Sequence, residues 1–411
     1  MRLASILGEV TTGAAGLSGS ARFRYLIAGQ FIVTVGGAIA PAALAFAILD
    51  SGGSLSSIGW VVACRALANT ASLAFGGVLA DRLPRHRLMF ASCAVASAGQ
   101  ACVAVLVFAG SANILVFALL SALGGLAAGI LLPASASVIV QLVAQSDLQR
   151  GNAVLRIAIN GALVVGTAGG GLLVATAGPA YGLLVDAVAS AVAAIVFLGI
   201  GRPDRDARST EAQSFMSELR VGWSEFLSRR WLWRVVLGFF FVNMVNPGVV
   251  QVVGPAIADM TVGRRGWGII LAAQTVGMIV GASTAMRVRA RHLLRYGLFF
   301  VPGIGIPLLV LAWSPSQVSL MFAFFFGGLA LEQFTVAWDT TMQRLVPSRH
   351  LARVTAYDAL GSYLGIPAGE LAVGPLVDDV GRSGVLIGSA TVVLIVVVVI
   401  VCHRDVWKLQ V

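Results

Sequence analysis

Six ionisable side chains lie inside long apolar stretches of this sequence, and they are the residues best placed to do chemistry. They are Arg65, Asp186, Glu332, Asp339, Asp358 and Glu370. A charge at the centre of a hydrocarbon layer costs at least ~2.5–3.5 kcal/mol, so such residues pair with one another, carry protons or bind charged solutes. The elements that hold them therefore have to be identified first.

The stretches around these residues are long enough to cross a membrane. Of 411 residues, 58% are hydrophobic and 11% are charged, whereas a soluble domain carries roughly 25% charge. The apolar runs fall at 25–49, 55–79, 88–109, 113–141, 153–176, 180–200, 232–256, 267–286, 295–313, 317–343, 354–376 and 384–402. A spanning helix needs ~20 residues, and helices satisfy their own backbone in lipid. We predict an all-α integral membrane protein with twelve transmembrane helices.

One long polar interruption divides the chain into two halves. We expect a cytoplasmic N-terminal tail at 1–21, a six-helix bundle at 22–200, a cytoplasmic linker at 201–231, a second six-helix bundle at 232–403 and a cytoplasmic tail at 404–411. The linker mixes Phe, Leu and Trp with Arg and Glu from Phe215 onward, which is typical of a helix lying along the membrane surface.

The distribution of basic residues predicts the orientation. With the N-terminus inside, the loops on the cytoplasmic side hold most of the arginines, and the opposite side has Arg264, Arg265 and Arg382. Excess Lys and Arg mark cytoplasmic loops. The formal charge of +10 therefore reflects topology, and we expect no nucleic-acid partner because no basic face with interleaved aromatic residues is present.

The two halves repeat each other. Leu142, Val143, Leu148, Arg150 and Ala153 recur at one constant offset as Leu345, Val346, Leu351, Arg353 and Ala356, and Gly77, Arg85 and Arg87 recur one position further on as Gly281, Arg289 and Arg291. The counterpart of Asp81 is Ala285, so one copy has lost its carboxylate. Parallel six-helix halves imply a pseudo-two-fold axis along the membrane normal.

The segment from Gly77 through Asp81 and Arg82 to Arg85 and Arg87, placed between the second and third spans, resembles the signature loop of the major facilitator superfamily. The resemblance covers essentially the whole chain. Shorter segments are similar to the actinobacterial drug-efflux-like branch, in the drug:proton antiporter type 3 group: 28–31, 79–87, 155–160, 338–341 and 357–362. Antiporters of the superfamily carry a glycine–proline pattern in the fifth span, and Gly166–Gly171 supplies glycines without the proline.

The resemblance implies a cytoplasmic gate. In it, Asp81 would sit near the N-terminus of the eleventh span, where a helix dipole favours an anion, and would fasten the halves together. The plainer interpretation is that the arginines hold the loop inside and Asp81 pairs with one of them. The gate set is Gly77, Asp81, Arg82, Arg85, Arg87, Asp339, Arg353 and Asp358. Asp339 and Asp358 lie near helix ends and are expected to pair with Arg344, Arg349 or Arg353.

Arg65 and Glu370 are expected to meet. At 1.5 Å per residue, Arg65 lies roughly 15 Å and Glu370 roughly 9 Å in from the outer end of its span, and spans two and eleven are neighbours in the fold that the resemblance implies. Either they form a fixed ion pair, or protonation of Glu370 breaks the pair during transport. Glu332, which has no basic residue in its own span, is the alternative proton carrier or counter-ion.

Neutral polar residues complete the set expected at a substrate cavity or coupling site. With Arg65, Asp186, Glu332 and Glu370, this set contains Asn69, Asn160, Asn243, Asn246, Gln251 and Gln274. Each amide has packing as its alternative, because amides also hydrogen-bond across helices. Asn246-Pro247-Gly248 in span seven favours a local distortion that exposes carbonyl groups to a cavity.

We expect a secondary active transporter that exports small, largely apolar organic compounds by alternating access, with proton antiport. The alternatives are a siderophore, lipid or metabolite exporter and a non-transporting membrane sensor. No Gly-x-x-x-x-Gly-Lys-Ser/Thr loop is present, so the energy source is a gradient. We expect no enzyme activity, cofactor or bound metal, and a monomer that works with substrate, protons and lipid in the bacterial plasma membrane.

Overall fold

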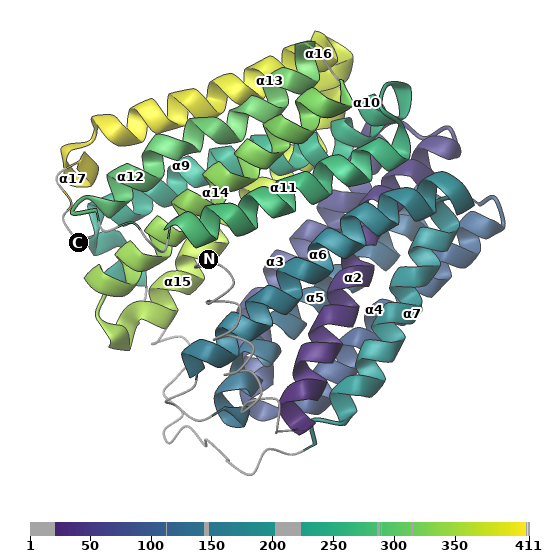
Figure 1. Ribbon diagram of the computed structural model, residues 1–411, viewed down its shortest axis with the longest axis horizontal. Helices are drawn as coiled ribbons and strands as arrows, with labels where there is room; N and C mark the ends of the chain where they lie inside the picture. Colours follow the sequence, from purple (N-terminus) through teal and green to yellow (C-terminus); the bar gives the residue numbers. More distant parts are fainter. Residues whose placement is uncertain are drawn as a thin grey trace, which may run out of the picture. The chain divides into compact units, whose positions relative to one another are not determined.

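The computed structural model describes residues 21–111, 113–143, 148–201, 223–285, 288, 290–313, 316–407 and 409. Within its helices, the side chains at 73–82, 136–137, 140, 148–150, 153, 348–353 and 404 lie outside the description. Most of the predicted tail at 1–21 and of the predicted linker at 201–231 also lies outside the described residues. The described residues form helices and no strand (Figure 1).

The chain divides into two compact units, which are described separately. The first comprises residues 1–47 and 64–208, and the second comprises residues 48–63 and 209–411. The first contains most of α2 (Ala21–Asp50) and α3 (Leu55–Arg82), together with α4 (Arg85–Phe108), α5 (Ile114–Leu142), α6 (Leu148–Ala177) and α7 (Pro179–Leu198). In this unit α4 packs against both α5 and α7.

Local sequence explains where several of these helices begin. The side chain of Asn113 accepts a hydrogen bond from the backbone N–H of Val116 and so caps α5, as Asn does at helix N-termini. Gly178 has φ 97°, a conformation that favours glycine, and Pro179 follows at the first helical position, where its missing N–H is not needed.

The second unit has more interrupted helices. It contains α9 (Arg230–Gly248), the π-helix η2 (Val249–Val253), α10 (Gly254–Met260), α11 (Gly263–Ala285), α12 (Leu293–Phe300), the 3-10 helix η3 (Val301–Gly305), α13 (Ile306–Trp313), α14 (Gln317–Leu345), α15 (Ser348–Tyr363), α16 (Gly365–Cys402) and α17 (Arg404–Trp407). The η2 segment directly follows Asn246-Pro247-Gly248, so the distortion predicted in span seven is present.

The lengths of these helices agree with the predicted transmembrane architecture. Ten helical stretches of the described chain are long and apolar enough to cross a membrane. The longest, Val354–Cys402, contains Gly381 with φ 77°, a left-handed conformation that ends one helix and starts another, so it holds two spans. Helix α3 has the length of a further span. The count is consistent with twelve.

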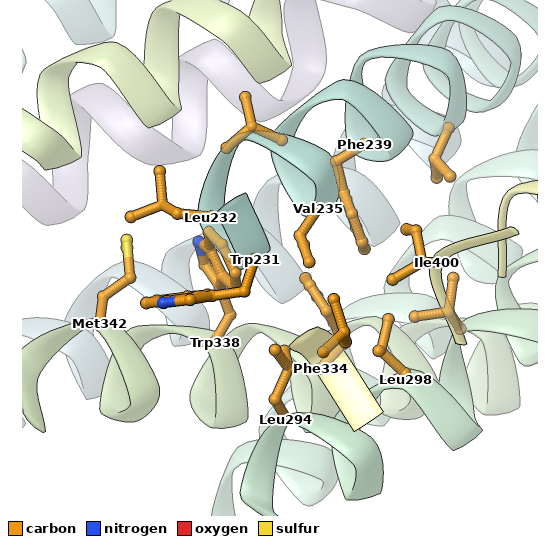
Figure 2. Close-up of a cluster of buried hydrophobic side chains, with 14 of the residues drawn as sticks. Trp231, Leu232, Val235, Phe239, Leu294, Leu298, Phe334, Trp338, Met342 and Ile400 are labelled. Carbon is orange, nitrogen blue, oxygen red and sulfur yellow. The ribbon is translucent and has the colours of Figure 1, made fainter. Parts of the chain in front are cut away.

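Aromatic and aliphatic side chains form the core of the second unit (Figure 2). Phe239 of α9 stacks on Phe334 of α14 with ring centroids 4.0 Å apart. Trp338 continues the stack from Phe334 and meets Trp231 edge-on. Figure 2 shows that these rings come from different helices and converge, so the core fixes α9 against α14.

Residues 48–63, which comprise the end of α2, the turn and the beginning of α3, belong to the second unit through specific contacts. Both terminal nitrogens of Arg264 at the start of α11 donate to the carboxylate of Asp50, one at 2.8 Å, while its Nε donates to Asp259 at 2.9 Å. A side chain at Gly59 would clash with the backbone oxygen of Glu370 in α16. The turn is therefore tied to two helices of this unit.

The segment after α16 is docked on the same unit. Asp405 pairs with Arg234 of α9 at 2.7 Å, the guanidinium of Arg295 lies 3.5 Å from the ring centre of Trp407, and Val406 is fully buried in the core. His292 Nδ1 donates to the backbone oxygen of Leu409 at 2.9 Å. The residues predicted as a C-terminal tail thus contact the N-terminal parts of α9 and α12.

Replacing Phe334 by alanine is expected to lower the thermal stability of the protein in lipid or detergent. Loss of a buried ring leaves a cavity that costs a few kcal/mol, because association of helices in lipid depends on close packing. Phe322 is the matched control: it lies on the same helix but is 62% exposed, against 4% for Phe334. Equal losses in Phe334→Ala and Phe322→Ala would contradict the core as described.

Candidate functional site

A polar cavity lies inside the first unit. It has a volume of about 220 Å³ and is lined by residues of α2, α3, α4, α5 and α7. Two charged residues, Arg65 and Asp186, face it together with neutral polar side chains from four of the helices. The polar lining residues are Gln30, Thr34, Arg65, Ser92, Cys93, Gln100, Ser135, Asp186 and Ser190. A cavity of this size has room for several water molecules, each of which occupies ~30 Å³ in the liquid.

Arg65 and Asp186 are brought together from helices distant in the sequence. Asp186 on α7 is 6% exposed and Arg65 on α3 is half-buried, and both of these described residues line the same cavity without a direct ion pair between them. A buried carboxylate is strongly destabilised unless a countercharge or hydrogen bonds accompany it. Gly36 of α2 makes room for it: a Cβ on Gly36 would lie 2.7 Å from Asp186 Oδ1.

The backbone at Arg65 lies at a close crossing that occurs in both halves of the chain. A side chain at Gly125 of α5 would clash with the backbone oxygen of Arg65 in α3, and one at Gly328 of α14 would clash with the backbone oxygen of Gln274 in α11. Gly125 and Gly328 stand at the offset of the sequence repeat. Arg65 and Gln274 do not stand at that offset, so the two crossings share the glycine but differ in the position of the facing helix.

A second buried carboxylate lies in the other unit. Glu370 on α16 is 1% exposed, and Gln251 in the π-helix donates its amide to Glu370 Oε1 at 3.4 Å. A side chain at Gly369 would clash with the backbone oxygen of Met244, so α16 and the seventh span touch through their backbones. π-Helical turns are frequent at functional sites. Arg65 belongs to the first unit, and its predicted proximity to Glu370 stays a prediction.

Asp358 on α15 sits in a hydrogen-bond network of neutral donors. Asp358 accepts from Trp338 Nε1 at 3.1 Å and from Ser362 Oγ at 3.5 Å. Asn243 of α9 donates to the backbone oxygen of Ser362 at 3.1 Å. Among the described side chains, neutral donors rather than Arg344 hold Asp358; the side chains of Arg349 and Arg353 lie outside the description.

The remaining predicted residues are placed as follows. Glu332 and Asp339 are half-buried on α14, and the Cβ of Glu332 lies near Gly281 of α11. Asn69 on α3, Asn160 on α6, Asn246 on α9 and Gln274 on α11 are all half-buried, and none of them lines the cavity of the first unit. Of the gate set, Arg85 and Arg87 begin α4, whereas the side chains of Gly77, Asp81, Arg82 and Arg353 lie outside the description.

Sequence reasoning missed several residues of the cavity. Gln30, Ser92, Cys93, Gln100, Ser135 and Ser190 line it. An amide within an apolar run can indicate a cavity-lining residue, and Gln30 and Gln100 are both such amides. Serine and cysteine are too common in packed membrane helices to indicate a cavity in the same way. Within the part of the chain that the structure describes, no group of three or more His, Cys, Asp or Glu side chains is arranged to hold a metal ion.

Comparison with known families defines the class of protein. The family model described as the Major Facilitator Superfamily matches residues 26–370. The chain therefore belongs to the major facilitator superfamily, whose members are transporters, and it is a multi-pass membrane protein.

Individual relatives are more distant. The chain is 24% identical over 384 residues to the multidrug efflux pump Tap of Mycolicibacterium fortuitum, covering 89% of this chain and 91% of that protein. Among solved structures it resembles the nucleoside transporter NupG (D323A mutant), with a TM-score of 0.79 at 14% identity over 93% of this chain and 99% of the other. It also resembles a bacterial homologue of the lysosomal transporter Spinster, with a TM-score of 0.75 at 14% identity over 95% and 98%. These structures establish the fold.

Substituting Gly36 by alanine is expected to destabilise the protein, because the added methyl group collides with Asp186 and with the Cβ of Ala189. Gly37→Ala is the matched control, since a Cβ at Gly37 meets nothing within 4 Å. Both changes gain the same helix propensity, up to ~1 kcal/mol, so the difference between the two melting temperatures isolates the collision. A Gly36→Ala protein as stable as the Gly37→Ala protein would show that Asp186 does not pack on α2.

Proposed function

We propose that this protein is a secondary active transporter that exports small, largely apolar organic compounds by alternating access, in exchange for protons. The observation that carries the proposal is the buried carboxylate of Asp186, which faces a polar cavity with Arg65 inside membrane-spanning helices. A proton that crosses the membrane potential supplies ~2.3 kcal/mol per 100 mV. That energy can bias two conformations that differ by a few kcal/mol.

The direction and the substrate class follow from two further observations. The relative that shares most of the chain's length at 24% identity is an efflux pump, which favours export. The short segments similar to the drug:proton antiporter type 3 group point to small, largely apolar organic compounds as substrates. Siderophores, lipids and metabolites are the alternative substrates.

We also propose a location, an orientation and an oligomeric state for the protein. We place it in the bacterial plasma membrane as a monomer, with both termini on the cytoplasmic side, because the arginine-rich loops mark that side. It needs no cofactor, since the proton gradient provides the energy. A sensor without transport activity is the remaining alternative, and it predicts ligand binding without movement of the ligand across the membrane.

Purified protein in proteoliposomes with an acidic lumen is expected to accumulate ethidium or another member of a panel of lipophilic dyes and antibiotics. Protons leaving the lumen drive the entry of substrate, so a protonophore is expected to abolish accumulation. Protein-free liposomes are the control. Accumulation that is insensitive to the protonophore would contradict proton antiport, and binding of panel compounds without any accumulation would favour the sensor.

A further inference from the structure

The cavity of the first unit is partly open, and buried polar side chains lie among the apolar residues of its lining. Asp186, Ser190, Ser92 and Gln30 are all at least nine-tenths buried, yet each of them lines it. Polar cavities inside proteins hold water that satisfies such groups, whereas empty cavities are apolar. The lining of this cavity is therefore that of a hydrated site within the bundle.

Gln100 gives an independent reason to expect an occupant. Its Nε2 is shielded from solvent and has no hydrogen-bond partner among the described protein atoms, and the residue lines the cavity from α4. A buried donor left unsatisfied costs ~1–3 kcal/mol. A water molecule in the cavity would accept this hydrogen bond and remove the cost.

The charges around the cavity are few and can be named helix by helix. Arg65 comes from α3 and Asp186 from α7, α4 contributes the thiol of Cys93, and the polar residues that α2 and α5 contribute are neutral. Arg does not lose its proton in proteins, and Cys93 is a buried thiol. Asp186 is thus the group whose charge can change while Arg65 keeps a fixed positive charge beside it.

We propose that Asp186 is the binding site of the coupling proton, with Arg65 as its fixed countercharge and the water of this cavity as the path to it. The inference rests on the proposed function and names the group that the proton occupies. Hydronium in the cavity gives its proton to a carboxylate oxygen of Asp186 and leaves as water, and the reverse transfer releases the proton.

Protonation of Asp186 has a mechanical consequence. The attraction between α7 and α3 through Asp186 and Arg65 exists only while the carboxylate is ionised. The α3 backbone at Arg65 lies against Gly125 of α5 without an intervening side chain. A change in the position of α3 therefore reaches α5 directly, so the arrangement of helices within the unit depends on whether the proton is bound.

The test compares two activities of Asp186→Asn in proteoliposomes. The probe is ethidium if the wild-type protein accumulates it, and otherwise a compound of the panel that the wild-type protein accumulates. Accumulation driven by the pH gradient needs a bound proton, whereas exchange of labelled for unlabelled substrate without a gradient does not. Asp186→Asn is expected to lose accumulation, down to the level of protein-free liposomes, and to retain exchange. Loss of both activities in a protein that is folded would show that Asp186 has a structural role only.

Further variants keep the result interpretable. Asp186→Asn leaves the half-buried Arg65 without its countercharge, which can destabilise the protein. The double variant Arg65→Gln/Asp186→Asn, which removes both charges, is therefore measured as well. It is expected to exchange substrate without accumulating it. Ser389→Ala is the control, because Ser389 is a buried residue of the second unit at the repeat offset from Asp186.

Variants of the other carboxylates distinguish an error in the proposed proton site from an error in the proposed function. If Asp186→Asn accumulates substrate as wild type does while Glu370→Gln or Glu332→Gln does not, the proton site is wrong and proton antiport stands. If wild type itself shows no accumulation driven by the pH gradient for any compound of the panel, the proposed function fails and the proton site with it.

Discussion

Placing charge in a medium that cannot solvate it is the constraint on which this structure depends. Three carboxylates in the described spans meet it in different ways: buried Asp186 lines a cavity with Arg65, buried Glu370 accepts from the amide of Gln251, and half-buried Asp358 accepts from the indole of Trp338. The Asp186 site is the one that combines a guanidinium with room for water.

Close backbone contacts bring these groups to their places. Helices that associate in lipid use small residues where their backbones approach, and Gly36, Gly125 and Gly369 lie next to Asp186, Arg65 and Glu370 respectively. Rigid positioning matters because a carboxylate that could turn away from its partner would lose most of the electrostatic interaction. The glycines of this chain thus serve its ionisable groups as well as its packing.

The two halves share repeated sequence positions but differ in their charged residues. Gly125 of α5 and Gly328 of α14 are repeat counterparts that each contact a neighbouring helix closely, but the position of Arg65 is taken by Gly268 in the second half. Asp186 corresponds by offset to Ser389. In this account the first unit holds the proton, while the second unit contributes a distorted seventh span and a buried carboxylate that the amide of Gln251 contacts.

Much of the fold could be predicted from sequence, because span length and hydrophobicity are local properties. The distortion in span seven was also predictable, since Asn246-Pro247-Gly248 removes a backbone donor and adds flexibility. The partner of Asp186 was not, because α3 and α7 are far apart in the sequence and only helix packing decides which faces meet. Asp358 accepts a hydrogen bond from Trp338 on another helix, which the sequence did not indicate, and its predicted pairing with Arg349 or Arg353 stays a prediction. The docked segment at Val406 was missed because short polar ends have no periodic pattern.

The most direct test of the central claim is proton release from purified protein in nanodiscs when a transported compound is added, measured for wild type and for Asp186→Asn. If substrate and proton compete through Asp186, wild type releases protons on binding substrate and Asp186→Asn binds the same substrate without release. Equal proton release from both proteins would contradict the account.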